Sequence, residues 1–343
     1  MSNGIRFGAI RWDAWYGHDD SDYNAVVNQC ERSLSPKQYR YRAPYFSTLN
    51  ENGKMRILPF SSNRADEELM LAEKAGIDFF AYVWYSRGKM TLSRRHHATA
   101  DTKLKMCAII DDNAITSAEC EDEIVALMKT DKWLKTEDSR PIIFYFTQSF
   151  DKIKISIEGY KAKCRKADCS IPMFFSMVDD DISKVLQSGC DGISEYSVWG
   201  RDGQSYESLT QKAKNAWQRG KDSNVQIIPC LAGGWDATPR YVTPVTWCEN
   251  DAQSYAVEPN GKQLEAHIND AYKWMNENKD VTRAGAMLIY AWNEHDEGGW
   301  ICPTVTVDND GFIITDENGC AIKNTERLDA VRRALKKNRE SDK

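Results

Sequence analysis

Hydrophobic residues along this chain gather in short runs, and each run leads into a polar or aromatic cluster and then into a stretch with helical periodicity. Most of the runs are rich in β-branched or aromatic residues. They lie at positions 5–17, 76–85, 105–113, 140–148, 171–181, 191–200, 225–236 and 284–294. Near-continuous apolar runs that alternate with helices are typical of parallel strands covered by helices on both faces of a sheet.

The number of runs favours a closed barrel. Eight parallel strands close a (β/α)8 barrel, and 343 residues leave room for insertions. The alternative is a doubly wound open sheet, but the sequence contains no G-x-G-x-x-G motif after the first run and no other phosphate loop. We therefore expect an α/β protein with a TIM barrel, and a single catalytic domain over residues 1–343 without a linker.

Two segments interrupt the alternation of strands and helices. Residues 44–60 alternate around a turn at Asn52 and Gly53, which predicts a hairpin inserted in the first βα connection. Residues 304–319 predict a second hairpin, followed by a terminal helix capped at Asn324 or Thr325. The DNDG sequence at 308–311 resembles the start of a calcium loop, but the later glutamate is missing, so a plain hairpin turn is favoured.

Charge and hydropathy exclude several classes of function. The net charge is −6 and no basic stripe is present, so nucleic acid is not an expected partner. No apolar run approaches the roughly 18 residues of a membrane span. The amino terminus MSNGIRFGAI lacks the basic start and apolar stretch of a signal peptide. This is typical of a cytoplasmic protein, or of a periplasmic or secreted one whose signal has been removed.

The ten cysteines do not form a metal-binding pattern. No CxxC pair exists, and the closest two, Cys164 and Cys169, have no histidine nearby, so zinc is not expected. Cys107, Cys190 and Cys230 lie in or beside predicted strands, where a free thiol packs as a small hydrophobe. We expect mostly reduced thiols with at most one or two surface disulfides, and neither a metal nor a cofactor.

Large aromatic residues and carboxylates occur together where the predicted strands end. Catalytic groups of a barrel come from these strand ends and the loops after them. The mixture suits a sugar, whose C–H faces stack on aromatic rings and whose hydroxyls bond carboxylates and amides. The candidate substrate-binding residues are Trp12, Asp13, Trp15, Tyr16, Trp84, Tyr85, Asp111, Glu195, Trp199, Trp235, Asp236, Trp292, Asn293, His295 and Trp300. The alternative for each aromatic is core packing, which is favoured for a mid-strand residue such as Tyr82.

The densest cluster of charge follows the eighth run, in YAWNEHDEGGW. Glu294 and Glu297 are three residues apart, which puts two side chains on one side of a turn with Cβ atoms roughly 5–6 Å apart. Retaining glycosidases use two carboxyls at about that range, one as acid/base and the other as nucleophile or base. Repulsion between them inside an aromatic wall is expected to raise one pKa and leave the other carboxyl ionised.

Other interpretations of this cluster remain open. The first alternative is that the cluster is a solvated acidic turn. The flanking Trp292 and Trp300 disfavour this interpretation. His295 is either a proton shuttle or a residue facing the adjacent loop, whereas Asp296 is expected to stabilise the loop by accepting backbone N–H groups. Glu195, at the end of the sixth run, is a second possible partner for the first glutamate.

At these residues the sequence resembles the glycoside hydrolase family 99-like group, whose founding activity is endo-α-mannosidase. That family's strand-eight signature is W/F-N-E-W-H-E-G, and this chain has WNEHDEG at 292–298. WDAWYG near the start, AEKAGIDFFAYVWY, GGWDATPR at 233–240 and the closing NTERLDAVRRAL look like the same group. The order of these motifs makes the resemblance span nearly the whole chain.

The resemblance implies a (β/α)8 barrel that hydrolyses an α-linked glycan with retention, through a 1,2-anhydro sugar. By position, Glu294 would deprotonate the sugar's own 2-hydroxyl and Glu297 would be the acid/base. Attack by that hydroxyl is an exception to the usual need for a protein nucleophile. His295 and Asp296 replace the family's Trp and His, which bears on mannose specificity more than on hydrolysis.

We therefore expect a glycoside hydrolase of polysaccharide degradation that acts on an oligo- or polysaccharide. The alternative on the same barrel is a protein that binds polysaccharide, or serves its biosynthesis, without hydrolysis. The two glutamates favour the enzyme, because a binding module needs the aromatic residues but not a carboxyl pair.

Overall fold

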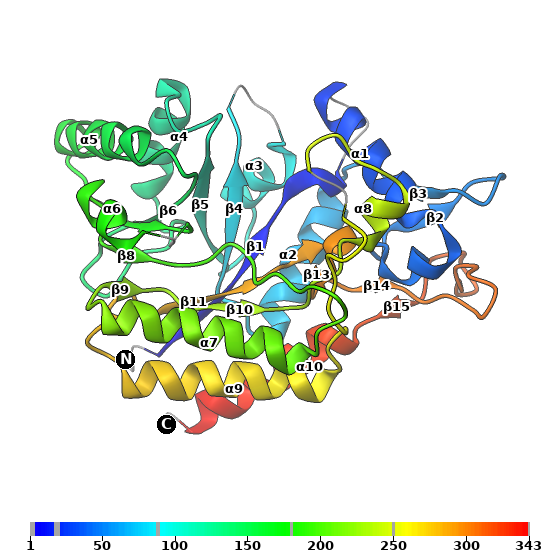
Figure 1. Ribbon diagram of the computed structural model, residues 1–343. Helices are drawn as coiled ribbons and strands as arrows, with labels where there is room; N and C mark the ends of the chain where they lie inside the picture. Colours follow the sequence, from blue (N-terminus) through cyan, green and yellow to red (C-terminus); the bar gives the residue numbers. More distant parts are fainter. Residues whose placement is uncertain (1–3, 17–20, 87–89, 179–180, 249–250, 342–343) are drawn as a thin grey trace.

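Parallel strands and helices alternate along the chain in the computed structural model, which describes residues 4–16, 21–86, 90–178, 181–248 and 251–341 (Figure 1). One sheet is built from β1 (Arg6–Arg11), β4 (Phe79–Trp84), β5 (Lys105–Asp111), β6 (Ile142–Phe146), β7 (Met173–Ser176), β8 (Gly192–Ile193), β9 (Gln226–Ile227), β10 (Cys230–Ala232) and β11 (Ala286–Tyr290). Its pairings are parallel, and every one of its strands lies within an apolar run that the sequence predicted.

The seventh predicted strand is shared between the two ends of this sheet. β9 pairs with β8, whereas β10, a few residues later, pairs with β11. Between them, the N–H of Ile228 bonds to the carbonyl of Ile193 at 3.1 Å, and the N–H of Leu288 bonds to the carbonyl of Pro229 at 2.8 Å. The sheet therefore curls back on itself in a TIM-barrel-like α/β fold, which confirms the predicted class over the open doubly wound sheet.

Most of the helices surround the strands on the outside of the sheet, whereas α1 (Ser21–Leu34) and α8 (Thr238–Val242) lie beside the loops at one end of the strands (Figure 1). The others are α2 (Ser62–Ala75), α3 (Leu92–Thr99), α4 (Ala118–Met128), α5 (Phe150–Ala167), α6 (Ile182–Gln187), α7 (Tyr206–Asp222), α9 (Gly261–Glu277) and α10 (Glu326–Ser341). α10 packs along α9 and against α2, and α9 lies beside α7. α2 ends where the sequence predicted, because Gly76 adopts φ 87°, a left-handed conformation that suits glycine.

The hairpin predicted in the first βα connection is present. β2 (Ser47–Leu49) and β3 (Met55–Ile57) pair antiparallel, and Gly53 takes φ 66° in the turn between them. Glu31 of α1 fastens this hairpin to the barrel, since its carboxylate accepts the N–H of Ile57 at 2.8 Å.

The second hairpin is longer than the predicted 304–319. β14 (Thr304–Val305) pairs with β15 (Lys323–Asn324), so the chain makes an extra pass and an extra turn at Asp316 before it returns. At the first turn the carboxylate of Asp308 accepts two backbone N–H groups at 2.9 Å, which is the plain turn rather than a calcium loop. α10 then begins at Glu326, whose N–H is accepted by the Asn324 side chain at 3.1 Å.

Three further observations concern the described residues. No helix among them is long and apolar enough to cross a membrane. None of their His, Cys, Asp and Glu side chains form a cluster that holds a metal ion. All ten cysteines are free thiols, and burial raises the pKa of Cys107 and Cys230.

Gly8 in β1 tests how tightly the barrel interior is filled. A Cβ at this position would lie 2.2 Å from the ring of the fully buried Phe79 on β4. We expect Gly8→Ala to lower the free energy of unfolding by about 1–3 kcal/mol, the usual cost of overpacking a core. Gly4→Ala is the matched control, because nothing lies within 4 Å of its Cβ. Urea unfolding measures both, and equal midpoints for the two variants would contradict the close packing.

Candidate active site

Both signature glutamates lie on a tight loop that follows β11. The chain forms β12 (Asn293–Glu294), a 3-10 turn (His295–Glu297) and β13 (Gly299–Trp300), and β12 pairs antiparallel with β13. Gly298 takes φ 82° at the turn. A Cβ there would also lie 2.5 Å from the backbone nitrogen of Asp236, so the glycine lets the loop approach the segment after β10.

Glu294 is the buried member of the pair. Its carboxyl accepts a hydrogen bond from the Tyr196 hydroxyl at 3.2 Å, and the guanidinium of Arg240 lies 3.8 Å away. Burial raises the pKa of Glu294 well above its ordinary value, the charge of Glu297 raises it further, and Arg240 acts in the opposite direction. One raised pKa within the pair is what the sequence predicted.

Glu297 is the more accessible member, with 17% of its side chain exposed. Its carboxylate accepts hydrogen bonds from the guanidinium of Arg240 and from the hydroxyl of Tyr290. Its backbone carbonyl accepts the N–H of Asp236 at 2.7 Å. Both the side chain and the backbone of Glu297 are therefore held in place.

Arg240, from the short helix α8, connects the acidic residues of the loop. Its Nε and Nη2 donate to the two carboxylate oxygens of Asp296 at 3.0 and 2.9 Å, while Nη1 donates to the carboxylate of Glu297. Burial opposes its charge, but Asp296 and Glu297 outweigh burial and raise the pKa of Arg240. The guanidinium also lies over the rings of Trp12 and Trp247, 5.6 and 5.7 Å from their centroids.

Asp296 stabilises the loop through different partners from those predicted. In place of backbone N–H groups, its fully buried carboxylate accepts both nitrogens of the Arg240 fork and the hydroxyl of Ser33 at 3.1 Å. It stabilises the loop, as expected, but through side chains from distant segments.

Trp12 is fixed at the end of β1 by two other predicted site residues. The side-chain amide of Asn293 accepts the backbone N–H of Trp12 at 2.9 Å and donates to its carbonyl. The indole N–H of Trp12 donates to the hydroxyl of Tyr85 at 2.9 Å. The structure thus brings these three residues together beside Arg240.

Aromatic rings extend from the carboxyl pair towards solvent. Tyr196 stacks on Phe146 at 4.3 Å between centroids and lies 5.5 Å from Tyr290. Tyr290 lies 6.0 Å from Trp235, on which Trp199 stacks at 5.6 Å. Trp199 is 65% exposed, so this aromatic wall ends in an open indole face.

Asp111 and Glu195 lie at the ends of other strands, outside the acidic loop. The carboxylate of Asp111 accepts the N–H groups of Asn113 and Ala114 at 3.0 and 2.9 Å, and burial raises its pKa. Glu195 is half-buried near Cys230, whose pKa it raises. The charges that act most on the first glutamate are those of the loop and of α8 rather than that of Glu195.

Three predicted site residues instead pack on the outer side of the strands. Trp84 lies under the guanidinium of Arg94, 4.0 Å from the ring centroid. The indole N–H of Trp292 donates to the buried carboxylate of Glu68 in α2 at 2.9 Å. Asp13 accepts an N–H from the first turn of α3 at 3.0 Å. Tyr82 is likewise buried, as the sequence favoured.

Trp15, Tyr16 and His295 form a buried layer behind the loop. His295 is fully buried, with the ring of Trp15 edge-on at 4.9 Å and that of Trp300 at 6.2 Å. Burial lowers the pKa of His295 to about 3, so its imidazole is neutral near pH 7. Tyr16 stacks on Phe46, the residue directly before β2, at 5.4 Å between ring centroids.

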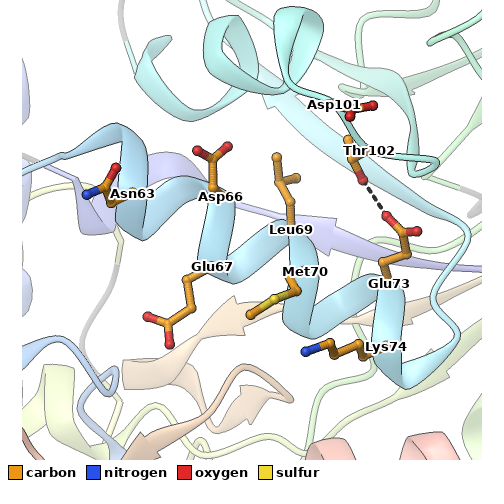
Figure 2. Close-up of a pocket in the computed structure, with 9 residues that line it drawn as sticks. All are labelled: Asn63, Asp66, Glu67, Leu69, Met70, Glu73, Lys74, Asp101 and Thr102. Atoms are coloured by element: carbon orange, nitrogen blue, oxygen red, sulfur yellow. Dashed lines mark hydrogen bonds between the residues drawn. The ribbon is translucent and has the colours of Figure 1, made fainter.

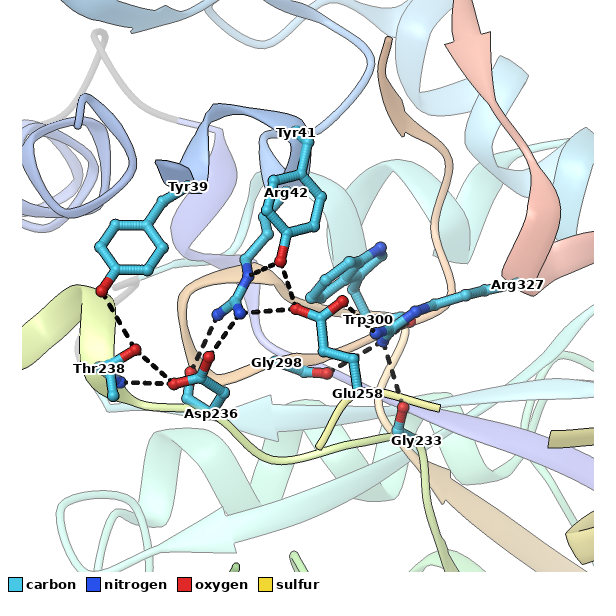
Figure 3. A network of polar contacts seen from close by, with 10 residues as sticks. All are labelled: Tyr39, Tyr41, Arg42, Gly233, Asp236, Thr238, Glu258, Gly298, Trp300 and Arg327. Atoms are coloured by element: carbon cyan, nitrogen blue, oxygen red, sulfur yellow. Dashed lines mark hydrogen bonds and ion pairs between the residues drawn. The ribbon is translucent and has the colours of Figure 1, made fainter. Parts of the chain in front are cut away.

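Asp236 and Trp300 belong to a polar network next to the loop (Figure 3). The carboxylate of Asp236 forms an ion pair with Arg42 and accepts the N–H of Thr238 at 2.9 Å. Arg42 also lies 2.6 Å from Glu258 and 5.6 Å from the ring centroid of Trp300. These side chains fix the segment that leads into α8.

A separate hollow of about 770 Å³ lies along the outer side of α2 (Figure 2). It is lined by Asn63, Asp66, Glu67, Leu69, Met70, Glu73, Lys74, Asp101 and Thr102. Two of its carboxylates are engaged locally, since Glu73 accepts the hydroxyl of Thr102 at 2.8 Å and Asp66 bonds to His96 at 2.6 Å. No residue of the acidic loop lines it, and no aromatic ring does, so the candidate site remains the loop.

Arg240, Tyr290 and Phe146 are not among the site residues predicted from the sequence. Arg240 lies within the GGWDATPR segment that carries part of the family resemblance. A signal was available, because three carboxylates in a mostly apolar setting require a nearby cation.

Comparison with known proteins adds to this geometry. Neither a protein-family model nor a curated protein sequence matches the chain. Solved structures match it at low identity. One is a GH99 endo-α-mannosidase from Bacteroides thetaiotaomicron, with a TM-score of 0.60 and 14% identity over 98% of each chain. The chain has the GH99 fold.

Two further structures agree. The same mannosidase in complex with BIS-TRIS-propane gives a TM-score of 0.59 at 16% identity, again over 98% of each chain. A glycoside hydrolase-like protein gives 0.62 at 14% identity, over 97% of this chain and 94% of the other. The resemblance inferred from the motifs is therefore confirmed as a likeness of GH99-type fold along the whole chain.

The ion pairs of Arg240 allow a direct stability test. We expect Arg240→Met to lower the free energy of unfolding by about 3–5 kcal/mol, because it leaves the buried Asp296 without a countercharge. Adding Asp296→Asn should recover part of that loss. Arg201→Met, which removes an exposed pair with Asp251, should change it by less than about 1 kcal/mol. Equal losses for the buried and the exposed variant in urea unfolding would count against the countercharge role.

Proposed function

We propose that this protein is a retaining glycoside hydrolase that cleaves an α-linked glycan, mannan-like or related, with residues 1–343 acting as one catalytic domain. The observation that carries the proposal is the carboxyl pair of Glu294 and Glu297, held by a single guanidinium next to an aromatic wall. The GH99-like fold supports the same reaction class.

In this proposal Glu297 is the general acid/base. Its accessible carboxyl protonates the glycosidic oxygen as the leaving group departs, and it later accepts a proton from the incoming water. Tyr290 and Arg240 aim the carboxyl through hydrogen bonds from two directions. A carboxyl with a fixed direction suits a reaction in which the proton must reach one particular oxygen.

Glu294 acts on the sugar's own 2-hydroxyl. It accepts that proton while the 2-oxygen attacks the anomeric carbon, and a 1,2-anhydro sugar forms as the glycosidic bond breaks. Water then opens this ring at the anomeric carbon and Glu294 returns the proton to the 2-oxygen, which gives net retention. Burial raises the pKa of Glu294, and a raised pKa makes its ionised form a stronger base.

The substrate would lie along the aromatic wall. Trp199 provides an open indole face that stacks on the buried Trp235, and the half-buried Tyr85 lies beside Trp12 near Arg240. Pyranose rings stack on such faces through their C–H groups. The other aromatic candidates from the sequence are buried in the packing of the barrel and the loop.

Product analysis tests the proposal. Incubation with α-mannan, α-glucan and N-glycan oligosaccharides should release sugars from at least one of them, with the retained anomer detected first by NMR. We expect Glu297→Gln to lower kcat by about 10²–10⁴-fold, the usual contribution of a general acid/base. Glu207→Gln, a substitution on the exposed face of α7, is the matched control and should retain activity. Saturable glycan binding that survives Glu297→Gln, without release of any product by the parent protein, would instead indicate a polysaccharide-binding protein.

The pH dependence follows from the raised pKa of Glu294. A general base must be ionised, so kcat/KM should fall as the pH drops through that pKa, at a higher pH than the ordinary glutamate value of 4.5. The hydrogen bond from Tyr196 lowers the pKa of Glu294, so Tyr196→Phe should move this acidic limb to still higher pH. Tyr255→Phe, at a partly exposed tyrosine, should leave it unchanged. An acidic limb near pH 4.5 in all three proteins would contradict the assignment.

A further inference from the structure

Arg327 connects the C-terminal helix to the catalytic loop. It is the second residue of α10, whose axis packs along α9 and against α2 on the outside of the barrel. Its side chain turns inward and is only 9% exposed, and Figure 3 shows its guanidinium between Trp300, Gly298 and Gly233.

One nitrogen of the Arg327 guanidinium contacts backbone alone. This nitrogen, Nη1, donates to three carbonyls, those of Gly298 at 3.0 Å, Trp300 at 3.1 Å and Gly233 at 3.2 Å. Two of these carbonyls, those of Gly298 and Trp300, belong to the segment that directly follows Glu297. The third, that of Gly233, directly follows β10. The guanidinium of Arg327 thus joins the Gly298–Trp300 segment of the loop to the residue that follows β10.

The rest of the guanidinium contacts the Trp300 ring and the carboxylate of Glu258. It lies flat over the indole of Trp300, 3.6 Å from the ring centroid, while Nη2 is 3.4 Å from the carboxylate of Glu258. Glu258 pairs with Arg42 as well, so it is the common anion of two arginines. Burial lowers the pKa of Arg327 and Glu258 opposes that effect. A cation in this setting is retained only where its contacts are well formed.

Other backbone contacts also hold the Gly298–Trp300 segment, since β12 pairs with β13 and the N–H of Ala291 bonds to the carbonyl of Gly299. The N–H of Asp236 bonds to the carbonyl of Glu297 at 2.7 Å, and close contact through Gly234 and Gly298 keeps the two backbones together. The carboxylate of Glu297 depends on that backbone position, because its bonds to Tyr290 and Arg240 come from other elements. A shift of the Gly298–Trp300 segment would therefore turn the carboxyl away from both donors.

We propose that Arg327 is a positioning residue, which holds the backbone after Glu297 so that the acid/base carboxyl stays aimed at the glycosidic oxygen. The inference rests on the proposed function for its kinetic consequence, whereas its structural part concerns the loop alone. Arg327 touches no reacting atom, so its removal should reduce turnover more than substrate binding.

The kinetic experiment compares Arg327→Met with Arg333→Met in the full chain. Arg333 lies on the same helix, is exposed and pairs with Glu265, so its replacement is the matched control. We expect kcat of Arg327→Met to fall about 100-fold with KM changed less than about threefold, since a displacement of about 1 Å costs that much in a positioned reaction. Arg333→Met should behave as the parent protein.

Arg327→Lys separates positioning from mere stability. An ammonium donates to carbonyls but lacks the flat fork that covers Trp300 and reaches Glu258. Its kcat should recover to within about tenfold of the parent, measured below the unfolding temperature of every variant. Parental kcat in a folded Arg327→Met, or a change confined to KM, would overturn the proposal. If Arg327→Met fails to fold, Arg327→Lys alone tests the proposal. A parental kcat in Arg327→Lys, together with the parental rate of hydrogen–deuterium exchange in the loop, would then overturn the proposal.

Hydrogen–deuterium exchange provides a readout that needs no activity. Residues 293–302 should exchange faster in Arg327→Met and in Arg327→Lys than in the parent, while α9 remains unchanged. Faster loop exchange in the variants, together with a parent protein that releases no sugar, would contradict the hydrolase and leave the positioning role standing. Loop exchange that is unchanged in both variants, together with an active parent protein, would contradict the positioning role alone.

Discussion

The guanidinium of Arg240 is the interaction on which the acidic loop depends. Glu294, Asp296 and Glu297 lie within four consecutive positions in a largely buried setting, where unpaired carboxylates cost several kcal/mol each. One planar fork provides two bonds to Asp296, one to Glu297 and a nearby charge for Glu294. A lysine offers a point charge without this geometry. The loop, the short helix α8 and the close approach of their backbones therefore form one unit.

The barrel was predictable because its strands are buried on both faces. Such strands appear in the sequence as continuous apolar runs, and every run located this way contains a strand of the sheet. The same property hides which way each side chain points, since both faces are apolar. Trp84 and Trp292 were therefore expected at the site, although they pack outside the strands against Arg94 and Glu68. The extra turn at Asp316 was missed because a second turn in a short segment changes no periodicity.

The site was predictable only where its chemistry is local. The spacing of Glu294 and Glu297 is visible in seven residues of sequence, and their placement on one loop follows from it. Arg240, Tyr290 and Tyr196 act on them from α8, β11 and the end of β8, and such pairings are set by the closed barrel rather than by sequence distance. His295 illustrates the same limit, because the burial between Trp15 and Trp300 that lowers its pKa is set by the fold rather than by its sequence neighbours.

The position of Arg327 on the last helix also bears on how the protein is made. Translation delivers Glu294 and Glu297 before α10, so a nascent chain carries the acidic loop while the cation that bonds its carbonyls is still unsynthesised. β11, the last strand of the sheet along the chain, also precedes α10. The packing of α10 on α9 and α2 places the guanidinium over Trp300. In the order of synthesis, every strand of the sheet and the acidic loop itself therefore precede the side chain that fastens the loop.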